Sequence, residues 1–181
     1  GYGDSPASWP EGTEPEPIEW YAGKQYDDCV AAAHDVLDNF DELFPQYKDQ
    51  GCQIAGFAWW QGHKDGNRVH AGRYEQNLVR LIKTLRKEFD APDAKFVCAT
   101  LGQTEKGATG NEGMILDAML AVDGESGKYP AFKGNVATVY THPLSQGGAS
   151  NGHYGGNAKT YMNVGLGMGQ AMVELLQDDG K

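Results

Sequence analysis

The chain has 181 residues, 40% of them hydrophobic and 10% aromatic, which is enough for one domain with a packed core. Acidic residues outnumber basic ones by 25 to 15, and the formal net charge is −10 at pH 7. Such a charge opposes attraction to phosphates, so nucleic acid and anionic membranes are excluded as expected partners. No apolar run reaches the roughly 18 residues of a membrane span, and the first residues lack the pattern of a signal peptide.

The three cysteines are Cys29, Cys52 and Cys98. They form no CxxC pair and have no histidine at zinc-finger spacing, so buried thiols are favoured over a metal site. A disulfide between two of them remains open, and the redox compartment is left undecided.

The first half of the chain begins without regular structure. Residues 1–23 hold four prolines among Gly, Ser and Glu, and we expect an irregular loop pinned by aromatic side chains. Residues 24–44 have apolar positions at helical spacing, which predicts an amphipathic helix ended by Pro45. Residues 53–60 form a mostly apolar run that suits a strand inside a parallel sheet.

The remaining pattern alternates helices with strands. Helices are predicted at 70–89, 111–122 and 158–176, and strands at 95–101 and 135–140. This order predicts an α/β fold, a three-layer α/β/α sandwich around a parallel sheet, with residues 1–181 in a single domain. Open parallel sheets usually have about five or six strands, so three strands predict half a sheet. An upstream segment or a partner chain should supply the rest.

Ligands bind such sheets outside the carboxyl ends of the strands. The segments to inspect are therefore 61–72, 102–111 and 141–157, with 1–9 as a fourth if Gly1 follows another strand.

Polar side chains follow the first predicted strand at Gln61, His63 and Asp65. A side-chain amide in this position can donate a hydrogen bond to a developing oxyanion, and Gly62 lets the backbone approach a ligand. A polar turn capped by Asp65 explains the same residues about equally well.

A second candidate is His153, in a Gly-rich turn before the last helix, where a general base could be placed. A surface or structural histidine is the alternative. His142 and His63 also follow strands, but the spacing fits no zinc-binding pattern, so neither metal nor cofactor is expected.

Several blocks of the sequence resemble the sialate O-acetylesterase-like carbohydrate esterases of the SGNH hydrolase superfamily. The stretch from Gly56 to Asp65 resembles their WxQGxxD block, and the stretch from His153 to Tyr161 resembles the histidine block that opens their last helix. The stretch from Gly3 to Trp9 looks like their GGxSxxxW block. The likeness runs over nearly the whole chain in the same order.

The resemblance implies a flavodoxin-like parallel sheet and a serine esterase that removes acyl groups, usually acetyl, from carbohydrate. It implies that His153 is the general base and that Gln61 and Gly3 line the oxyanion hole. It also implies a secreted or periplasmic location.

The chain departs from the family pattern in three places. The serine nucleophile of the family lies in a GQSN-like block before the segment that matches Gly3, so we expect it upstream of this chain. Ser5 stands in a Gly-Asp-Ser that imitates a nucleophile motif, but no strand precedes it. Ser150 stands where relatives often place the acid that orients the histidine, and His63 stands where many have Glu or Trp.

Two other functions stay open. A catalytically inactive member could bind glycans or serve an assembly through the same crevice, using its tryptophans. A flavin or nucleotide binder is a weaker alternative, because the sequence has no Gly-rich phosphate loop near its start.

Overall fold

The computed structural model describes residues 23–147 and 150–178. The chain divides into two compact units, Gly1–Gln53 and Ile54–Lys181, which are described separately below. The prediction that residues 1–181 act as a single domain stays a prediction. None of the helices in the described residues is long and apolar enough to span a membrane.

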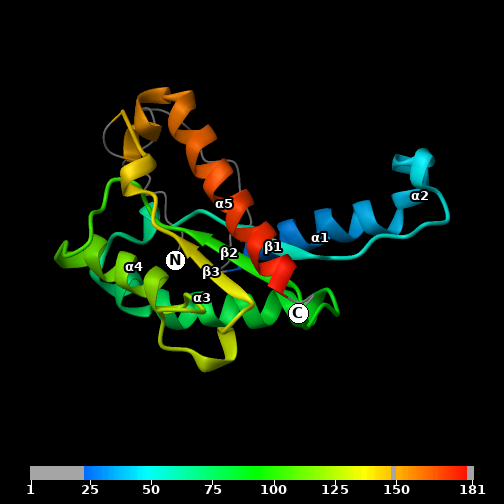
Figure 1. Cartoon of the computed structure of the whole chain (residues 1–181), viewed down its shortest axis with the longest axis horizontal. Coiled ribbons are helices and arrows are strands. Elements are labelled where there is room, and N and C mark those ends of the chain that lie inside the picture. Colours follow the sequence, from blue (N-terminus) through cyan, green and yellow to red (C-terminus); the bar gives the residue numbers. More distant parts are fainter. Residues whose placement is uncertain (1–22, 148–149, 179–181) are drawn as a thin grey trace, which may run out of the picture. The chain divides into compact units, whose positions relative to one another are not determined.

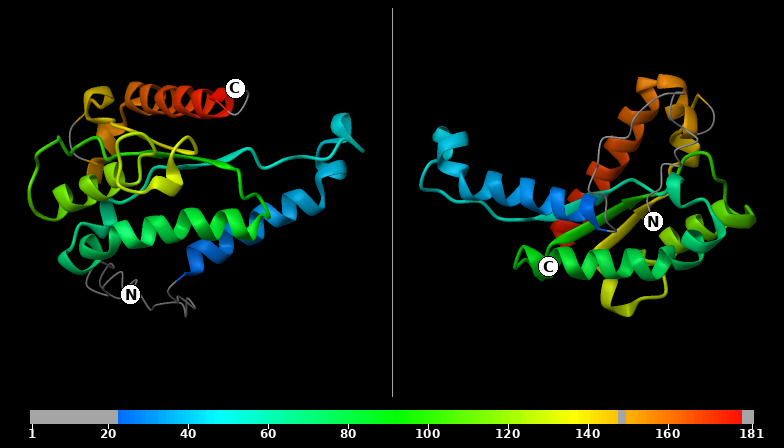
Figure 2. Two further views of the ribbon diagram at one scale, coloured as in Figure 1. Left: turned by 60° about the horizontal axis from the view of Figure 1, so that its bottom comes forward. Right: turned by 180° about the vertical axis from the view of Figure 1, so that it is seen from behind.

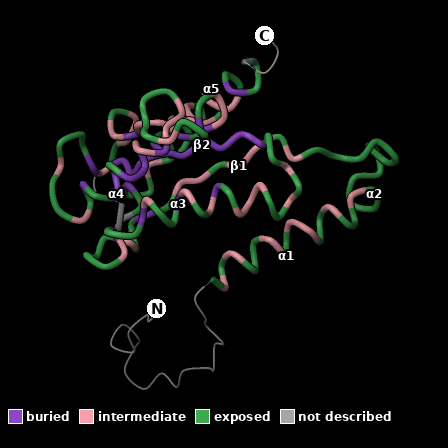
Figure 3. Tube along the Cα trace, turned by 90° about the horizontal axis from the view of Figure 1, so that it is seen from below, coloured by how far each residue is buried: buried purple, intermediate pink, exposed green. Residues whose placement is uncertain are grey.

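The first unit contains helices α1 (Lys24–Asp38) and α2 (Phe40–Leu43), followed by a 3-10 turn at Pro45–Tyr47. The single helix expected at 24–44 is therefore wrong in its length. Asn39 is the C-cap of α1, with a non-helical φ of −105° and ψ of 20°, and its side-chain amide also donates to the Asp35 carbonyl. No residue of α1 is buried (Figure 3). Cys29 and Cys52 are exposed free thiols, so the expectation of buried thiols is correct only for Cys98.

The second unit contains a parallel sheet of three strands in the order β1-β2-β3 (Figure 1). The strands are β1 (Gly56–Trp59), β2 (Lys95–Ala99) and β3 (Val136–Val139). Phe57 of β1 lies beside Phe96 of β2, which lies beside Val136 of β3. The α/β class and the parallel sheet are confirmed, although each strand is shorter than its sequence pattern suggested.

Helices cover both faces of this sheet. Helices α3 (Arg68–Glu88) and α4 (Gly110–Ala121) pack on each other on one side, and α5 (Ala158–Asp178) packs on β2 and β3 on the other side (Figure 2, left). This is the predicted three-layer arrangement. The largest fully buried side chains between α3, α4 and the sheet are Ile82, Phe96, Ile115, Met119, Val122, Phe132 and Val136.

The two outer edges of the sheet differ. At the outer edge of β3, the Thr138 backbone N–H donates to the Asp123 carboxylate at 2.8 Å, and the Gly124 N–H donates to the Val136 carbonyl at 2.9 Å. Both groups point away from β2, so the turn after α4 caps this edge. β1 pairs with β2 alone, and its Ala58 is exposed, whereas the paired Val97 of β2 is buried. Among the described residues, β1 therefore has an uncapped outer edge.

Candidate active site at the carboxyl ends of the strands

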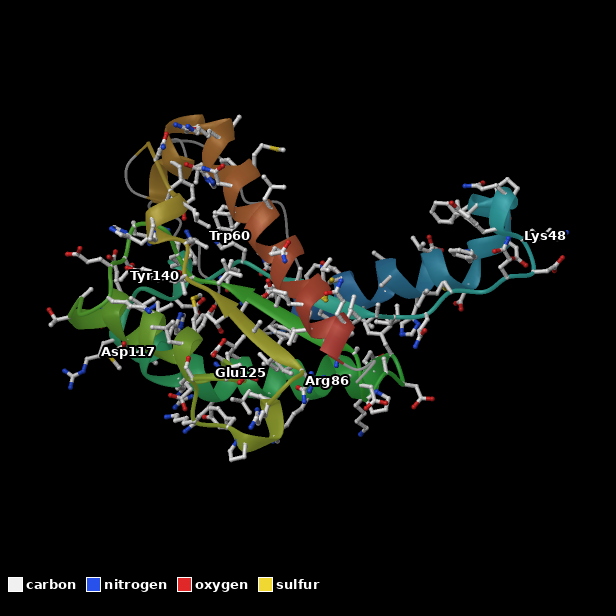
Figure 4. All side chains as sticks on the ribbon, in the orientation of Figure 1. Lys48, Trp60, Arg86, Asp117, Glu125 and Tyr140 are labelled. Carbon is white, nitrogen blue, oxygen red and sulfur yellow. The ribbon has the colours of Figure 1, made fainter. Side chains whose placement is uncertain are left out.

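A cavity of about 550 Å³ lies where β1 and β2 end. Its lining comes from the segment that follows β1, from Leu101 just after β2, and from the turn that opens α5. The lining residues are Trp60, Gln61, Gly62, His63, Lys64, Leu101, His153, Tyr154 and Tyr161. The structure thus brings together three predicted site residues that are up to about ninety positions apart, namely Gln61, His63 and His153. Figure 4 shows Trp60 and Arg86 at opposite ends of the sheet. The Arg86 guanidinium donates hydrogen bonds to the Ala94 and Asn135 carbonyls, which precede β2 and β3.

The backbone of Gln61 is fixed from beneath by Tyr74 of α3. The Tyr74 hydroxyl donates to the Gln61 carbonyl and accepts from the Trp59 indole N–H at 3.2 Å. Burial raises the pKa of Tyr74 well above its ordinary value, so the hydroxyl stays protonated and can donate. A Cβ at Gly62 would lie 3.1 Å from the same hydroxyl and 3.0 Å from Met119, which explains the glycine that follows Gln61.

The side chain of Gln61 is oriented by Asp65. The Gln61 amide nitrogen donates to one carboxylate oxygen of Asp65 at 3.1 Å, and the other oxygen lies 3.7 Å from His70 Nδ1. A primary amide has two N–H donors, so one remains for a ligand. Asp65 does not itself line the cavity. Its carboxylate therefore positions Gln61, whereas the turn is closed by the Asp65 backbone N–H, which donates to the Gly62 carbonyl at 3.0 Å. The prediction that the Asp65 side chain caps the turn is wrong.

The turn that carries His153 has a strained backbone. Four successive residues have positive φ: His153 at 47°, Tyr154 at 53°, Gly155 at 62° and Gly156 at 69°. For residues with a Cβ this conformation costs roughly 1–2 kcal/mol each. Such strain persists only where surrounding contacts impose it, and it is common at functional sites. Here it leaves the His153 side chain exposed at the cavity.

Three aromatic rings supply those contacts. The buried Tyr154 stacks on Trp60 with centroids 5.8 Å apart, and Tyr161 of α5 meets both rings edge-on. The Trp60 indole N–H donates to the Thr100 carbonyl at 3.1 Å, and the Tyr161 hydroxyl donates to the His153 carbonyl at 3.2 Å. The histidine is thus attached to the end of β2 and to the first turn of α5, which Asn157 caps by accepting from the backbone N–H groups of residues 159 and 160.

The loop after β2 is held against this turn at Gly102. Its N–H donates to the Tyr154 hydroxyl at 3.0 Å, and its carbonyl lies 2.8 Å from His142 Nδ1. A Cβ at Gly102 would lie 1.9 Å from Ser145 Oγ, so only glycine fits there. Burial raises the pKa of Tyr154, although the Gly102 hydrogen bond opposes this. His142 is therefore occupied by a backbone contact and is absent from the cavity lining, which separates it from His153.

Other predicted site residues lie beyond what the structure describes. Gly3 and Ser5 fall outside the described residues, and so does the side chain of Ser150. Among the described lining residues there is no serine, aspartate or glutamate. Within residues 23–147 and 150–178, no group of three or more His, Cys, Asp or Glu side chains could hold a metal ion.

Sequence reasoning did not identify the roles of Tyr154, Tyr161 and Gly102. The two tyrosines stand in the quoted histidine block, so the sequence held a signal for them. No sequence pattern predicts that Gly102 is held between His142 and Tyr154, because these residues lie 40 and 52 positions away from it in the sequence.

Comparisons with known proteins give one family match and one similar solved structure. A family model described as carbohydrate esterase, sialic acid-specific acetylesterase, matches residues 9–174. A crystal structure of an Arabidopsis thaliana protein is similar in fold, with a TM-score of 0.51 and 21% sequence identity. The match covers 83% of this chain and 51% of that chain, so this chain spans about half the length of the solved relative. No curated protein matches the chain in sequence. The chain belongs to the carbohydrate esterase family of sialic acid-specific acetylesterases, and its α/β fold is similar to that of the solved Arabidopsis protein.

Proposed function

We propose that this chain provides the general base and the oxyanion-binding amide of a carbohydrate O-acetylesterase whose serine nucleophile lies upstream. The observation that carries the proposal is that His153 and Gln61 line one cavity at the carboxyl ends of the strands. Membership in a carbohydrate esterase family supports the reaction class.

In the proposed reaction, His153 takes the proton of the serine hydroxyl as its oxygen attacks the acetyl carbonyl. The tetrahedral intermediate carries a negative oxygen, and the second N–H of Gln61 donates to it, together with the backbone at Gly3. His153 then gives its proton to the departing sugar oxygen, which leaves an acetyl-serine. His153 then deprotonates a water molecule that attacks this ester, and it returns that proton to the serine oxygen as acetate leaves.

The aromatic lining suits the carbohydrate part of the substrate. Trp60 and Tyr161 offer ring surfaces beside His153, and Tyr161 is 40% exposed. Sugar C–H groups pack on such rings while their hydroxyls stay hydrated. The volume of about 550 Å³ is within the roughly 300–1,000 Å³ range of small-molecule sites.

A second candidate function is glycan binding without catalysis. Ser150 in place of the orienting acid favours it, as does the lack of any carboxylate among the described lining residues. Without that acid the tautomer of His153 is less fixed and its protonated form is less stabilised. The secreted or periplasmic location implied by the resemblance stays a prediction.

The test uses the natural polypeptide, including the residues that precede Gly1 in it, and an O-acetylated sugar as substrate. We expect hydrolysis that falls at least 1,000-fold in His153→Ala, because a triad base contributes roughly that much. His34→Ala, on α1 outside the cavity, serves as the matched control and should stay within twofold. Sugar binding without hydrolysis would select the second candidate, and hydrolysis that survives His153→Ala would refute the assignment of the base.

A further inference from the structure

Helix α3 has a basic face on a chain that is acidic as a whole. Six of the 15 basic residues lie on this helix, against only two of the 25 acidic residues. The formal net charge of the whole chain is −10. The rest of the chain is therefore even more acidic, and the positive charge of α3 is a local feature.

The basic residues lie on the side of α3 that points away from the sheet. Leu78 and Ile82 are buried in the core, and Arg80 lies midway between them in the sequence. Because successive helical residues are about 100° apart, the Arg80 side chain leaves the helix opposite to the core. Residues at spacings of three and four share this orientation, and all are exposed: Arg73, Gln76, Arg80, Lys83 and Lys87. The four cations among them form the basic face.

These four cations are open to a ligand. Within the described residues, none of them forms an ion pair with an acidic side chain. Glu75, one of the two acidic residues of α3, is bound instead by Lys128 at 2.6 Å and by the Tyr129 hydroxyl. Part of the basic face lines a groove of about 340 Å³. The lining residues are Gln76, Val79, Arg80, Lys83, Thr84 and Lys87.

The helix that carries the basic face begins beside the cavity. Lys64 lines the cavity, and α3 starts four positions later at Arg68. The basic face extends over about 20 Å from Arg73 to Lys87. Neighbouring helices of a layered α/β fold pack at the sides of α3, so the face opposite the sheet stays in solvent. A long polymer that enters the cavity can therefore also lie along α3.

We propose that the basic face of α3 binds an anionic polysaccharide through its carboxylate or sulfate groups. The cations attract these groups, whereas the acidic remainder of the chain repels polyanions, so binding is confined to this helix. Arg73, Arg80 and Lys87 are two helical turns apart, about 10 Å, which is on the scale of a disaccharide repeat. Membership in a carbohydrate esterase family makes a polysaccharide the polyanion of choice.

A polymer held on the basic face keeps its acetylated units at a high local concentration near the cavity. This consequence rests on the proposed esterase function, whereas the binding itself does not.

The test measures the fluorescence anisotropy of labelled polysaccharides mixed with the natural polypeptide. Two matched pairs separate charge from sugar: polygalacturonate with its methyl ester, and dextran sulfate with dextran. We expect a charged polymer to bind in about 50 mM salt and to be released at about 0.5 M, because salt screens exposed charges. Preference for the charged member of the first pair identifies carboxylates as the bound groups, and preference in the second pair identifies sulfates.

The test variant is Arg80→Gln with Lys83→Gln, and the control is Lys48→Gln with Lys106→Gln. Each removes two exposed positive charges, so the net charge changes equally. We expect the test variant to weaken binding roughly tenfold, because two exposed charge contacts are lost, and the control to stay within twofold. Both should keep the Tm within about 1 °C, because these side chains lie in water. For an acetylated polygalacturonate, the test variant should raise KM and leave kcat unchanged.

Equal binding by the test variant and the control would overturn the proposal, and so would equal binding of charged and neutral polymers in both pairs. Tighter binding of single-stranded DNA than of either polysaccharide would also overturn it and would assign the basic face to nucleic acid. Anisotropy requires no hydrolysis, so an inactive polypeptide that binds the polymer would refute only the proposed reaction. Hydrolysis of a small acetylated sugar without polymer binding would refute only the basic face.

Discussion

The two outer edges of the sheet differ in whether their backbone groups are hydrogen-bonded by neighbouring segments. At β3, Asp123 and Gly124 satisfy the outward-facing backbone, and nearby side chains such as Phe132 are buried. At β1 the outer edge is uncapped in the described residues, and Ala58 on its face is exposed. The side with β3 should therefore account for more of the stability of this chain than the side with β1.

The largest effect should come from paired phenylalanines on neighbouring strands. Phe96 of β2 is 1% exposed, and its neighbour Phe57 of β1 is half-buried, with its ring 5.8 Å from that of Phe89. Phe96→Ala should lower the free energy of unfolding by about 4 kcal/mol, because it leaves a cavity in the core. Phe57→Ala should cost about half as much in this chain. Urea unfolding measures both, and equal losses would contradict the contrast between the strands.

The cap on β3 gives the next largest effect. Burial by itself raises the pKa of Asp123, but hydrogen bonds from Ser126, Thr138 and Glu125 outweigh it and hold the pKa below its ordinary value. Asp123→Ala should lower the free energy of unfolding by about 2 kcal/mol, since the part-buried Thr138 N–H and the N–H groups of Glu125 and Ser126 all lose their acceptor.

The same carboxylate makes stability depend on pH. Because the folded-state pKa is lowered, its contribution is complete above the ordinary carboxyl pKa of about 4 and is lost as the pH falls through the folded value. Unfolding measured from pH 6 down to pH 2.5 should show a steeper loss in the wild type than in Asp123→Asn. Parallel curves would mean that the cap does not depend on the charge.

The Tyr154 hydroxyl links the loop after β2 to the cavity, because it accepts a hydrogen bond from the Gly102 N–H. Tyr154→Phe keeps the ring stacked on Trp60 but removes the acceptor of the buried Gly102 N–H. We expect a loss of about 1–2 kcal/mol in the free energy of unfolding. Backbone NMR should show changed chemical shifts at Gly102 and His153. Tyr161→Phe, which frees only the His153 carbonyl, is the milder control.

The smallest effect on stability should come from Asp65, which positions Gln61 at the end of β1. Asp65→Ala leaves the Gln61 amide without its acceptor. We expect kcat of the natural polypeptide to fall about tenfold, because a side-chain hydrogen bond of this kind contributes roughly 1.4 kcal/mol. The Tm should change little. Asp65→Asn retains an acceptor oxygen and should restore part of the activity. An unchanged kcat in Asp65→Ala would refute the positioning role.

The fold was largely predictable, because the apolar residues of most elements follow the spacing of a helix or of a buried strand. The strand runs and the apolar faces of α3 and α5 predicted the α/β class and the three strands that the described residues form. The break at Asn39 and the exposure of Cys29 and Cys52 were missed, since they depend on which surfaces the first unit buries.

The site was predictable where chemistry coincides with a motif. Gln61, His63 and His153 stood near strand ends and line one cavity in the structure. The left-handed turn at His153 and the contacts of Gly102 were not predictable, because both result from packing between distant loops.

The most direct test of the account is active-site labelling with a fluorophosphonate, which reacts with activated serines. The upstream segment, expressed separately and mixed with this chain, should be labelled on one serine, and His153→Ala in this chain should abolish the labelling. This result would place the nucleophile outside residues 1–181 and assign its activation to His153. Labelling of Ser5, or of any serine within this chain alone, would contradict the account.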